Sequence, residues 1–285
     1  MSGDPGTAFQ PLAEEHVEAA WRLSAQAGWN QTPDDWRRLV RLAPGGVRVL
    51  VEDGLAVASW SVVSCGDVAW IGMIIVEEGH RGRGLGMLAF DQALAAARGA
   101  GHRVIGLDAT DLGAPLYRRR GFEPIAPIVR WQGTVAAVDI AGGARSGAAA
   151  CRRGLTAGVL RLDARLAGAD REPLLVDLAT TATLLHLERD GETVAYAAIR
   201  PGRVADFVGP VVAIDDEAFA AMMQEGARTL AGRTAICDLL DPQGEGVLAS
   251  LGLAPARHLA RMTLPADPGC LCGPGIWCGA GFELG

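Results

Sequence analysis

The segment from Val76 to Gly86, VEEGHRGRGLG, places four glycines and two arginines between an apolar stretch and an amphipathic one. Glycines at 82, 84 and 86 let the backbone approach a ligand closely, because they carry no Cβ and adopt positive φ at little cost. Arg81 and Arg83 add positive charge where the N–H groups of a following helix also attract anions. The pattern predicts a diphosphate site, with a plain flexible turn as the alternative.

Two common phosphate loops do not match this segment. A Walker loop is excluded because no Gly-Lys-Ser/Thr follows the glycines. The dinucleotide fingerprint is excluded because it belongs to the first βαβ unit of a parallel sheet, whereas the strand before this loop ends an antiparallel meander. The ligand is therefore expected to be a diphosphate of another class.

That meander is predicted from three stretches rich in β-branched and aromatic residues, Val47 to Glu52, Ala56 to Ser64 and Val68 to Val76. Asp-Gly and Gly-Asp pairs between them are hairpin signals. The loop then leads into a helix predicted from Gly84 to Ala97. The order strand, loop, helix places the glycines at a helix N-terminus.

The rest of the first half alternates between helices and strands. Helical spacing from Glu14 to Gln26, and Thr32 as an N-cap before Pro33, predict two early helices after one short strand. The elements expected after the loop are a strand at Val104 to Asp108, a helix at Ala114 to Arg120 and a strand at Ile128 to Gln132.

The chain from about Phe9 to Trp131 resembles the GNAT superfamily of acetyl-CoA-dependent N-acetyltransferases. The family's Arg/Gln-x-x-Gly-x-Gly/Ala motif stands here as Arg81 to Gly86, and its Leu-Tyr pair ahead of Gly-Phe stands as Leu116-Tyr117 before Gly121-Phe122. The resemblance implies acetyl-CoA as co-substrate and no metal. The cofactor contacts that it implies are Ile74, Ile75, Val76, Arg81, Gly82, Arg83, Gly84, Leu85, Gly86, Thr110 and Tyr117.

In such proteins a neutral amine attacks the acetyl thioester directly. Tyr117 matches the family tyrosine that protonates the leaving thiolate, and a phenol pKa of ~10 is close enough to a thiol pKa of ~8.5 for proton transfer. Glu77 and Glu78 are the predicted bases, acting directly or through water. The alternatives are that Tyr117 packs on the cofactor arm while water protonates the thiolate, and that the two acids form a solvated turn.

The second half repeats the order of the first. Setting Gly72 beside Gly209 aligns three pairs of segments, which are Ile74 to Val76 with Val211 to Ala213, Ile105 to Asp108 with Ala235 to Asp238, and Gly121 to Pro124 with Gly252 to Pro255. The sequence therefore predicts a duplication. The elements expected here are a helix at Arg171 to Thr180, strands at Thr183 to Glu188, Thr193 to Ile199 and Val204 to Ala213, and a helix at Glu217 to Leu230 capped by Asp215 and Asp216.

The second copy lacks the features of a cofactor site. Its strand runs through Ile214, Asp215 and Asp216 directly into the next helix, and Leu248 stands opposite Tyr117. Two carboxylates at the place of the phosphates oppose an anionic ligand. This copy is expected to shape the acceptor pocket instead. The predicted substrate contacts are Trp70, Tyr196, Asp206 and Phe207, with a purely structural place in the sheet as the alternative for each.

The predicted fold is a mixed α/β (α+β) chain with a largely antiparallel twisted sheet flanked by helices, the acyl-CoA N-acyltransferase fold, in two copies. The expected boundaries are a catalytic domain at 1–135, a linker at 136–158 and a degenerate domain at 159–285. The predicted function is transfer of acetyl to a small-molecule or peptide amine. The alternatives are a non-catalytic acyl-CoA-binding sensor or interaction module, and transfer of a longer acyl group.

Composition limits the partners and the compartment. The 33 acids outnumber 26 basic residues, all of them Arg, and the net charge of -7 opposes a nucleic-acid footprint over the whole chain. No apolar stretch reaches the ~20 unbroken residues of a membrane helix, and the first residues do not resemble a signal peptide, so we expect a cytoplasmic protein. Cys270, Cys272 and Cys278 cluster without a nearby His, which predicts no metal site.

Overall fold

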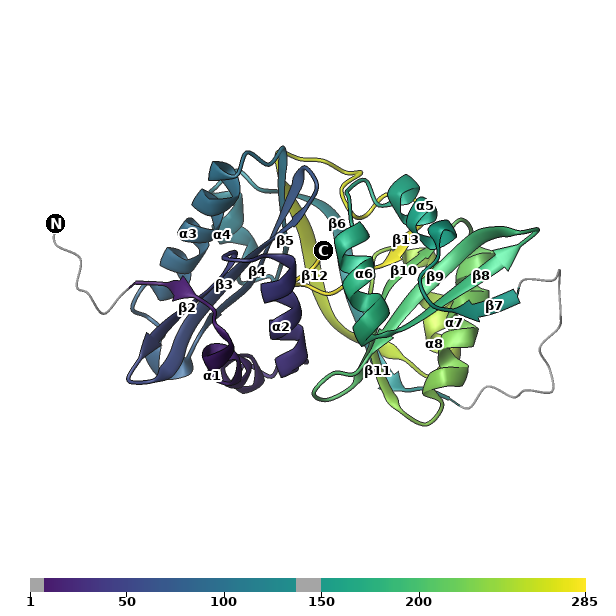
Figure 1. Cartoon of the computed structure of the whole chain (residues 1–285), viewed down its shortest axis with the longest axis horizontal. Coiled ribbons are helices and arrows are strands. Elements are labelled where there is room, and N and C mark those ends of the chain that lie inside the picture. Colours follow the sequence, from purple (N-terminus) through teal and green to yellow (C-terminus); the bar gives the residue numbers. More distant parts are fainter. Residues whose placement is uncertain (1–7, 137–149) are drawn as a thin grey trace.

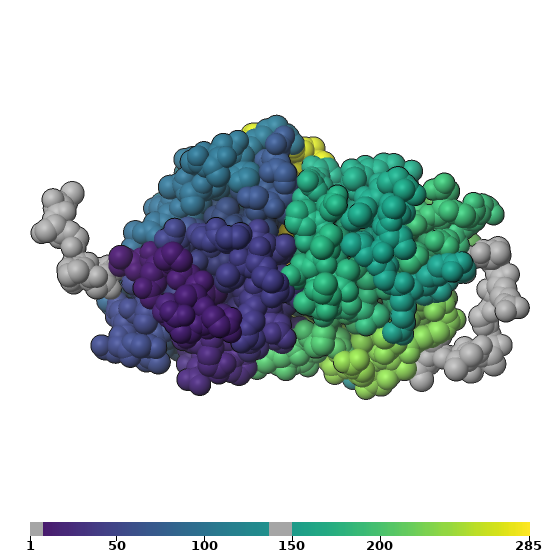
Figure 2. Space-filling model, in the orientation of Figure 1, coloured from purple at the N-terminus to yellow at the C-terminus, as the bar shows by residue number. Residues whose placement is uncertain are grey.

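A computed structural model describes residues 8–136 and 150–285 (Figure 1). Over these residues, two lobes share one continuous sheet of 13 strands, with helices on both faces. The sheet is mixed and largely antiparallel, which confirms the predicted fold class. On the face shown in Figure 2, the two lobes meet along the middle of the molecule.

The first lobe contains β1 (Gln10–Pro11), α1 (Glu14–Gln26), α2 (Pro33–Leu42), β2 (Val47–Glu52), β3 (Leu55–Cys65), β4 (Val68–Val76), the short 3-10 helix η1 (Glu78–His80), α3 (Leu85–Gly99), β5 (Val104–Ala109), α4 (Ala114–Arg118) and β6 (Glu123–Thr134). The predicted helices and strands of this half are all present. Thr32 caps α2 as expected, since its hydroxyl accepts a hydrogen bond from the Asp35 N–H at 3.3 Å.

The second lobe contains β7 (Ala150–Arg153), α5 (Ala157–Leu166), α6 (Glu172–Thr181), β8 (Thr183–Arg189), β9 (Glu192–Arg200), β10 (Asp206–Ala213), α7 (Asp216–Leu230), β11 (Thr234–Leu239), the 3-10 helix η3 (Pro242–Gly244), α8 (Glu245–Ser250), β12 (Ala254–Leu264) and β13 (Ile276–Cys278). The sequence did not predict β7, α5, β12 or β13. Residues 137–149 of the predicted linker lie outside the described residues, and 150–153 form β7 beside β8.

One strand of each lobe is exchanged with the other lobe. The strand order runs β1-β2-β3-β4-β5-β12-β6-β11-β13-β10-β9-β8-β7. β12 therefore pairs with β5 of the first lobe, and β6 pairs with β11 of the second. The two exchanged strands also pair with each other at the centre of the molecule. The division at residues 135 and 159 stays a prediction, and hydrogen-bonded strands connect its two sides.

Two buried ion pairs repeat this exchange. Arg130 on β6 holds Asp238 on β11, with N–O distances of 2.7 and 2.8 Å. Arg261 on β12 holds Asp108 on β5, with both distances 3.0 Å. Asp108 and Asp238 are aligned in the repeat, so each pair joins an aspartate of one copy to an arginine of the other.

The core lies in layers on the two faces of the sheet. One apolar cluster contains buried residues of α1, α2, α5 and α6 together, so these four helices cover one face across both lobes. On the opposite face, α3 packs over β3, β4 and β5, and α7 packs over the second lobe. The shared cluster makes the two lobes parts of one hydrophobic core.

Each lobe has an opening between two parallel strands. β4 and β5 pair only at Val68 to Trp70, and β10 and β11 pair only at Asp206 and Phe207. Beyond those residues the strands separate. A break in register with the preceding strand follows in both lobes, between Gly72 and Ile75 on β4 and between Val208 and Val211 on β10. The repeat predicted from sequence therefore extends to the irregularities of the sheet.

The opening in the second lobe is filled by the protein's own chain. β13 lies between β10 and β11 and pairs antiparallel with both. Its central Trp277 is 3% exposed and stacks on Phe219 of α7, with ring centroids 4.2 Å apart and an interplanar angle of 8°. This strand leaves no free edge at that place on β10.

Candidate active site

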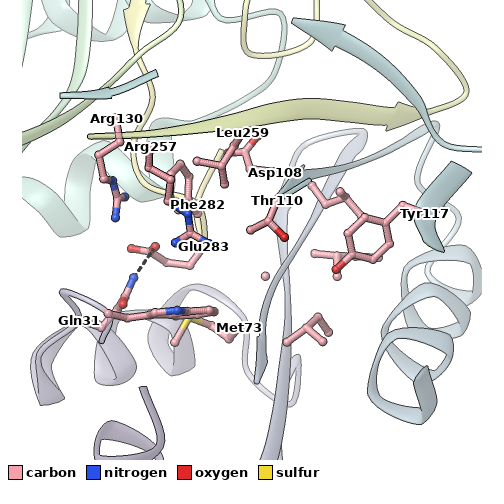
Figure 3. Close-up of a pocket in the computed structure, with 15 residues that line it drawn as sticks. Gln31, Met73, Asp108, Thr110, Tyr117, Arg130, Arg257, Leu259, Phe282 and Glu283 are labelled. Carbon is pink, nitrogen blue, oxygen red and sulfur yellow. Dashed lines mark hydrogen bonds between the residues drawn. The ribbon is translucent and has the colours of Figure 1, made fainter. Parts of the chain in front are cut away.

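The opening in the first lobe is a cavity of about 230 Å³ (Figure 3). Past Trp70, no strand of the described residues pairs with the β5-facing edge of β4. The lining residues come from both lobes and are Trp29, Gln31, Ile71, Gly72, Met73, Ile74, Leu107, Asp108, Thr110, Tyr117, Arg130, Arg257, Leu259, Phe282 and Glu283. Backbone groups of β4 are therefore available to a ligand beside a partly apolar space.

The glycine loop lies between the end of β4 and the start of α3. Gly82 and Gly84 have φ of 77° and 81°, conformations that a residue with a Cβ rarely adopts, and a Cβ at either position would meet nothing within 4 Å. No side chain caps α3, so N–H groups of its first turn face outward. Arg81 and Arg83 are exposed here, and Arg83 contacts Glu52 at 3.2 Å. The loop fits an anionic ligand because it is open, positive and rich in free N–H donors.

The other predicted cofactor residues lie along the path from this loop to the cavity. Ile74 and Val76 of β4 are half-exposed, whereas Ile75 points into the core, as alternation along a strand requires. Thr110 lines the cavity, and its hydroxyl accepts a hydrogen bond from the Gly113 N–H at 3.2 Å. The last two members of the predicted set are Leu85, which is buried at the start of α3, and Gly86, which is half-buried one residue later.

Tyr117 lies on α4, across the cavity from the second lobe (Figure 3). Its ring packs on Phe90 of α3, with centroids 4.7 Å apart. Burial raises the pKa of the phenol above its ordinary value of 10.0, so the hydroxyl carries its proton at neutral pH. The side chain is held by packing while its hydroxyl faces the cavity, which suits a proton donor.

Glu77 and Glu78, the bases predicted from sequence, do not line this cavity. The Glu77 carboxylate accepts a hydrogen bond from Nδ1 of His80 at 2.6 Å, and this contact lowers the pKa of Glu77. A lower pKa makes the carboxylate a weaker base. Glu78 is exposed at the start of η1. The structure brings neither side chain to Tyr117.

Two of the four predicted substrate contacts are buried and do not reach the cavity. The Tyr196 hydroxyl donates to Asp163 at 2.5 Å and lies 3.2 Å from Arg171, inside the second lobe. Trp70 is also fully buried, and its indole N–H donates to the Phe282 carbonyl at 3.1 Å. The structure does not support the prediction that these two residues contact the substrate, because each side chain is enclosed by its own structural partners.

The other two predicted contacts, Asp206 and Phe207, lie in the second lobe and line different cavities. Asp206 forms an ion pair of 2.6 Å with Arg233 and lines a separate hollow. Phe207 lines a small cavity of about 20 Å³, which shares Gln31, Arg130 and Glu283 with the main one. Of the four predicted contacts, Phe207 is therefore the one that lines a cavity adjoining the main one.

The sequence did not predict the part played by the C-terminal segment, residues 279–285. This segment runs from β13 to the β4 side of the cavity and leaves the chain end between the lobes (Figure 1). A Cβ on Gly209 would lie 2.1 Å from the Gly279 carbonyl oxygen, and a Cβ on Gly72 would lie 2.9 Å from Cα of Glu283. The two glycines aligned by the repeat therefore both make room for this segment.

Glu283 is the acidic side chain that the segment carries into the cavity. It is 3% exposed, accepts a hydrogen bond from the Gln31 amide at 2.9 Å and lies 3.4 Å from Arg200 (Figure 3). Burial raises its pKa, although Arg200 opposes this shift. The neighbouring Phe282 ring lies under the Arg130 guanidinium at 4.1 Å. The signal available in the sequence was a single acid within an apolar, glycine-rich stretch, GIWCGAGFELG.

Residues 8–136 and 150–285 contain no group of three or more His, Cys, Asp or Glu side chains that could hold a metal ion. All six cysteines are free thiols, and Cys270 and Cys278 are buried. None of the helices in the described ranges has the length and apolar character needed to cross a membrane.

Comparison with protein families gives a match in each half of the chain. Residues 13–122 match the acetyltransferase (GNAT) family, and residues 159–268 match an acetyltransferase (GNAT) domain. Together the two matches span most of the sequence. A search of curated proteins gave no match.

Solved structures share the fold at low sequence identity. A proposed acetyltransferase from Pyrococcus horikoshii has a TM-score of 0.82 at 16% identity, covering 100% of this chain and 98% of its own. A GCN5-related N-acetyltransferase from Sphaerobacter thermophilus has a TM-score of 0.65 at 14% identity, covering 92% and 96%. A tandem GNAT protein from the clavulanic acid biosynthesis pathway has a TM-score of 0.63 at 16% identity, covering 91% and 99%.

Proposed function

We propose that this chain, which belongs to the GNAT superfamily and carries two of its domains in tandem, transfers the acetyl group of acetyl-CoA to a small amine bound between its lobes. Membership in the family indicates acyl transfer in general. The observation that supports acetyl-CoA and a small amine as the substrates is the contrast between the two sheet openings. The opening beside the glycine loop and Tyr117 is a cavity, and the aligned opening in the second lobe contains β13.

The residues of the first lobe suit acetyl-CoA as substrate. Its diphosphate would bind at Gly82, Gly84 and the first N–H groups of α3, with Arg81 and Arg83 nearby. Its pantetheine arm carries amide groups that can pair with the free edge of β4, as an added strand would. The thioester then points toward the cavity that Tyr117 and Thr110 line.

Tyr117 would act as the proton donor. When the amine nitrogen attacks the carbonyl carbon, a C–N bond forms, the C–S bond breaks, and the departing thiolate needs a proton. The Tyr117 hydroxyl carries one at neutral pH because burial raises its pKa. The phenolate that remains regains a proton from the positively charged nitrogen of the new amide.

The dimensions of the cavity favour a small acceptor. A volume of about 230 Å³ bounded by both lobes is at or below the lower end of ligand pockets, about 300 Å³. Trp29, Leu259 and Phe282 offer apolar contacts, while Glu283 offers a negative charge for an ammonium group. These features support a small primary amine with an apolar body over a lysine on a folded protein surface.

The second lobe is proposed to bind no acetyl-CoA. Asp215 and Asp216 stand at the start of α7, where the glycine loop stands before α3, and the Asp215 carboxylate accepts the Ala218 N–H at 2.7 Å. The helix N-terminus is therefore already capped by an acid. β13 occupies the strand edge as well. We expect one acetyl-CoA per chain.

The test combines calorimetric titration with acetyl-CoA and an assay of thiol release with 2-phenylethylamine, putrescine, glucosamine and a lysine peptide. Because the chain contains no Lys, thiol release without added amine cannot come from acetylation of its own lysine side chains. One site per chain with amine-dependent release is the expected result. Binding without release would favour the acyl-CoA sensor, and no binding would refute the proposal.

Tyr117→Phe separates chemistry from binding. The variant keeps the ring that packs on Phe90 and loses only the hydroxyl. We expect kcat to fall about 100-fold, the lower end of the effect of a general acid, with an unchanged Kd for acetyl-CoA. An unchanged kcat would remove Tyr117 from the mechanism, and a weakened Kd would show that it packs on the cofactor arm.

A further inference from the structure

The amine acceptor needs a base, and the sequence-predicted candidates do not provide one at the cavity. A primary amine has a pKa of ~10 and is an ammonium ion at neutral pH. Its nitrogen must lose a proton before it can attack the thioester. Glu77 is held by His80, and neither Glu77 nor Glu78 lines the cavity. The acceptor side of the cavity therefore needs another proton acceptor.

Three other acids lie near, and each of them forms an ion pair with an arginine. The Asp108 carboxylate faces Arg261 and is 1% exposed, so the part of Asp108 that can face the cavity is its backbone. The Asp35 carboxylate contacts Arg38 and accepts a hydrogen bond from the Thr32 N–H at 2.8 Å. Glu283 is the third, and it both lines the cavity and has a looser arginine contact, at 3.4 Å.

We infer that Glu283, brought from the second lobe by the C-terminal segment, anchors the acceptor ammonium and takes its first proton. This inference rests on the proposed function. Gln31 orients the carboxylate through one oxygen, at 2.9 Å. Figure 3 shows Glu283 and Tyr117 on opposite sides of the same cavity, with Thr110 between them. Proton acceptor and proton donor thus come from different lobes.

The two residues account for both protons that the nitrogen loses. The Glu283 carboxylate accepts one proton from the ammonium, which gives a carboxylic acid and a neutral amine. The amine then attacks the thioester carbonyl, and the thiolate leaves with the Tyr117 proton. The second nitrogen proton restores Tyr117. Glu283 finally releases its proton to water, so one proton is produced for each acetyl group transferred.

The surroundings of Glu283 tune it for this step. A carboxylate with the ordinary pKa of ~4.3 is a weak base toward an ammonium ion, whose pKa is ~10. Burial raises the pKa of Glu283 and so reduces the difference between the two pKa values. The charged groups that act on it from the elements around it are Arg200 of β9, Asp35 of α2, Arg130 of β6 and Asp108 of β5. Arg38 of α2 and Asp238 of β11 act on Arg200 in turn.

The test is the pH dependence of turnover in Glu283→Gln, with 2-phenylethylamine or the panel amine that gives the highest rate as the probe. The variant keeps the size of the side chain. We expect kcat/KM at pH 7 to fall about 100-fold or more, and then to recover about ten-fold per pH unit as the free amine forms. The Kd for acetyl-CoA should stay unchanged, because Glu283 is not part of the glycine loop.

Controls separate a base from a structural residue. Glu283→Asp keeps a carboxylate on a shorter side chain and should retain part of the activity with the wild-type pH profile. Glu192→Gln, at an exposed position at the start of β9, should leave all parameters unchanged. A loss in Glu283→Gln that is equal at every pH would refute the inference, as would no loss. If the wild type acetylates no amine in the panel, the proposed function is refuted, and the role of Glu283 as a base is refuted with it.

Discussion

The strand that fills the second lobe can be tested by removing its central side chain, in the variant Trp277→Ala. Trp277 is 3% exposed, stacks on Phe219 at 4.2 Å and donates its indole N–H to the Ala213 carbonyl at 3.2 Å. Truncation removes these contacts and leaves a cavity between β13 and α7. A buried Trp→Ala change costs about 3–5 kcal/mol of the free energy of unfolding.

Urea unfolding followed by far-ultraviolet circular dichroism measures this loss. With an m-value of about 3 kcal/mol/M, the midpoint should fall by about 1–1.7 M. Leu112→Ala is the control, because Leu112 is 94% exposed and its truncation should change stability by less than about 0.5 kcal/mol. A loss below about 1 kcal/mol in Trp277→Ala would show that β13 does not dock in the opening.

The same variant also tests the proposal that the acids of the second lobe keep it from binding acetyl-CoA. Asp215 and Asp216 remain in place when Trp277 is truncated, so the acids still oppose a diphosphate. Calorimetry should therefore still give one acetyl-CoA per chain. A second site in Trp277→Ala would refute this reasoning, because β13 would then be the sole obstacle.

Three further substitutions test the glycine loop, the fit of the C-terminal segment and the titration of Asp108. Gly84→Asp should abolish acetyl-CoA binding in calorimetry, because the φ of 81° strains the new residue and its carboxylate repels the diphosphate; a retained Kd would contradict the loop assignment. Gly72→Ala should lower kcat with little change in the Kd for acetyl-CoA, because the new Cβ would lie 2.9 Å from Cα of Glu283. Gly99→Ala is the control and should leave kcat and Kd unchanged, because a Cβ there would meet nothing within 4 Å. Burial raises the pKa of Asp108 from 3.8 to about 6, so its contribution to stability is present below about pH 4 and is lost as the pH rises through about 6. Urea unfolding across this range should be less dependent on pH in Asp108→Asn, and an identical pH dependence would contradict the shift.

Local patterns in the sequence were sufficient to predict most elements of the fold. The meander of β2, β3 and β4, the capped start of α2 and the glycine loop all depend on residues close together in the chain. The duplication was also predictable, because the segments of the two halves align in order once Gly72 is set beside Gly209. The structure adds that a break in register lies near each of these glycines. The cofactor side of the site follows from these local features.

The acceptor side could not be predicted in this way, because its residues come together only through long-range strand pairing. Nothing near β12 in the sequence indicates that it pairs with β5 rather than with a strand of its own lobe. The C-terminal segment carries no regular pattern, so the path that brings Glu283 to Gln31 was not predictable. Sequence alternation likewise did not show that Tyr196 faces a buried Asp163.

The exchange of β6 and β12 also determines how an acceptor can enter and leave. Many enzymes with two lobes open and close about a hinge. Here backbone hydrogen bonds join β5 to β12, β12 to β6 and β6 to β11, across the line where a hinge would lie. Separating the lobes would break these hydrogen bonds. For the proposed reaction we therefore expect the acceptor to enter and leave through movement of side chains that line the cavity, such as the exposed Arg257 and the half-exposed Trp29, and not through separation of the lobes.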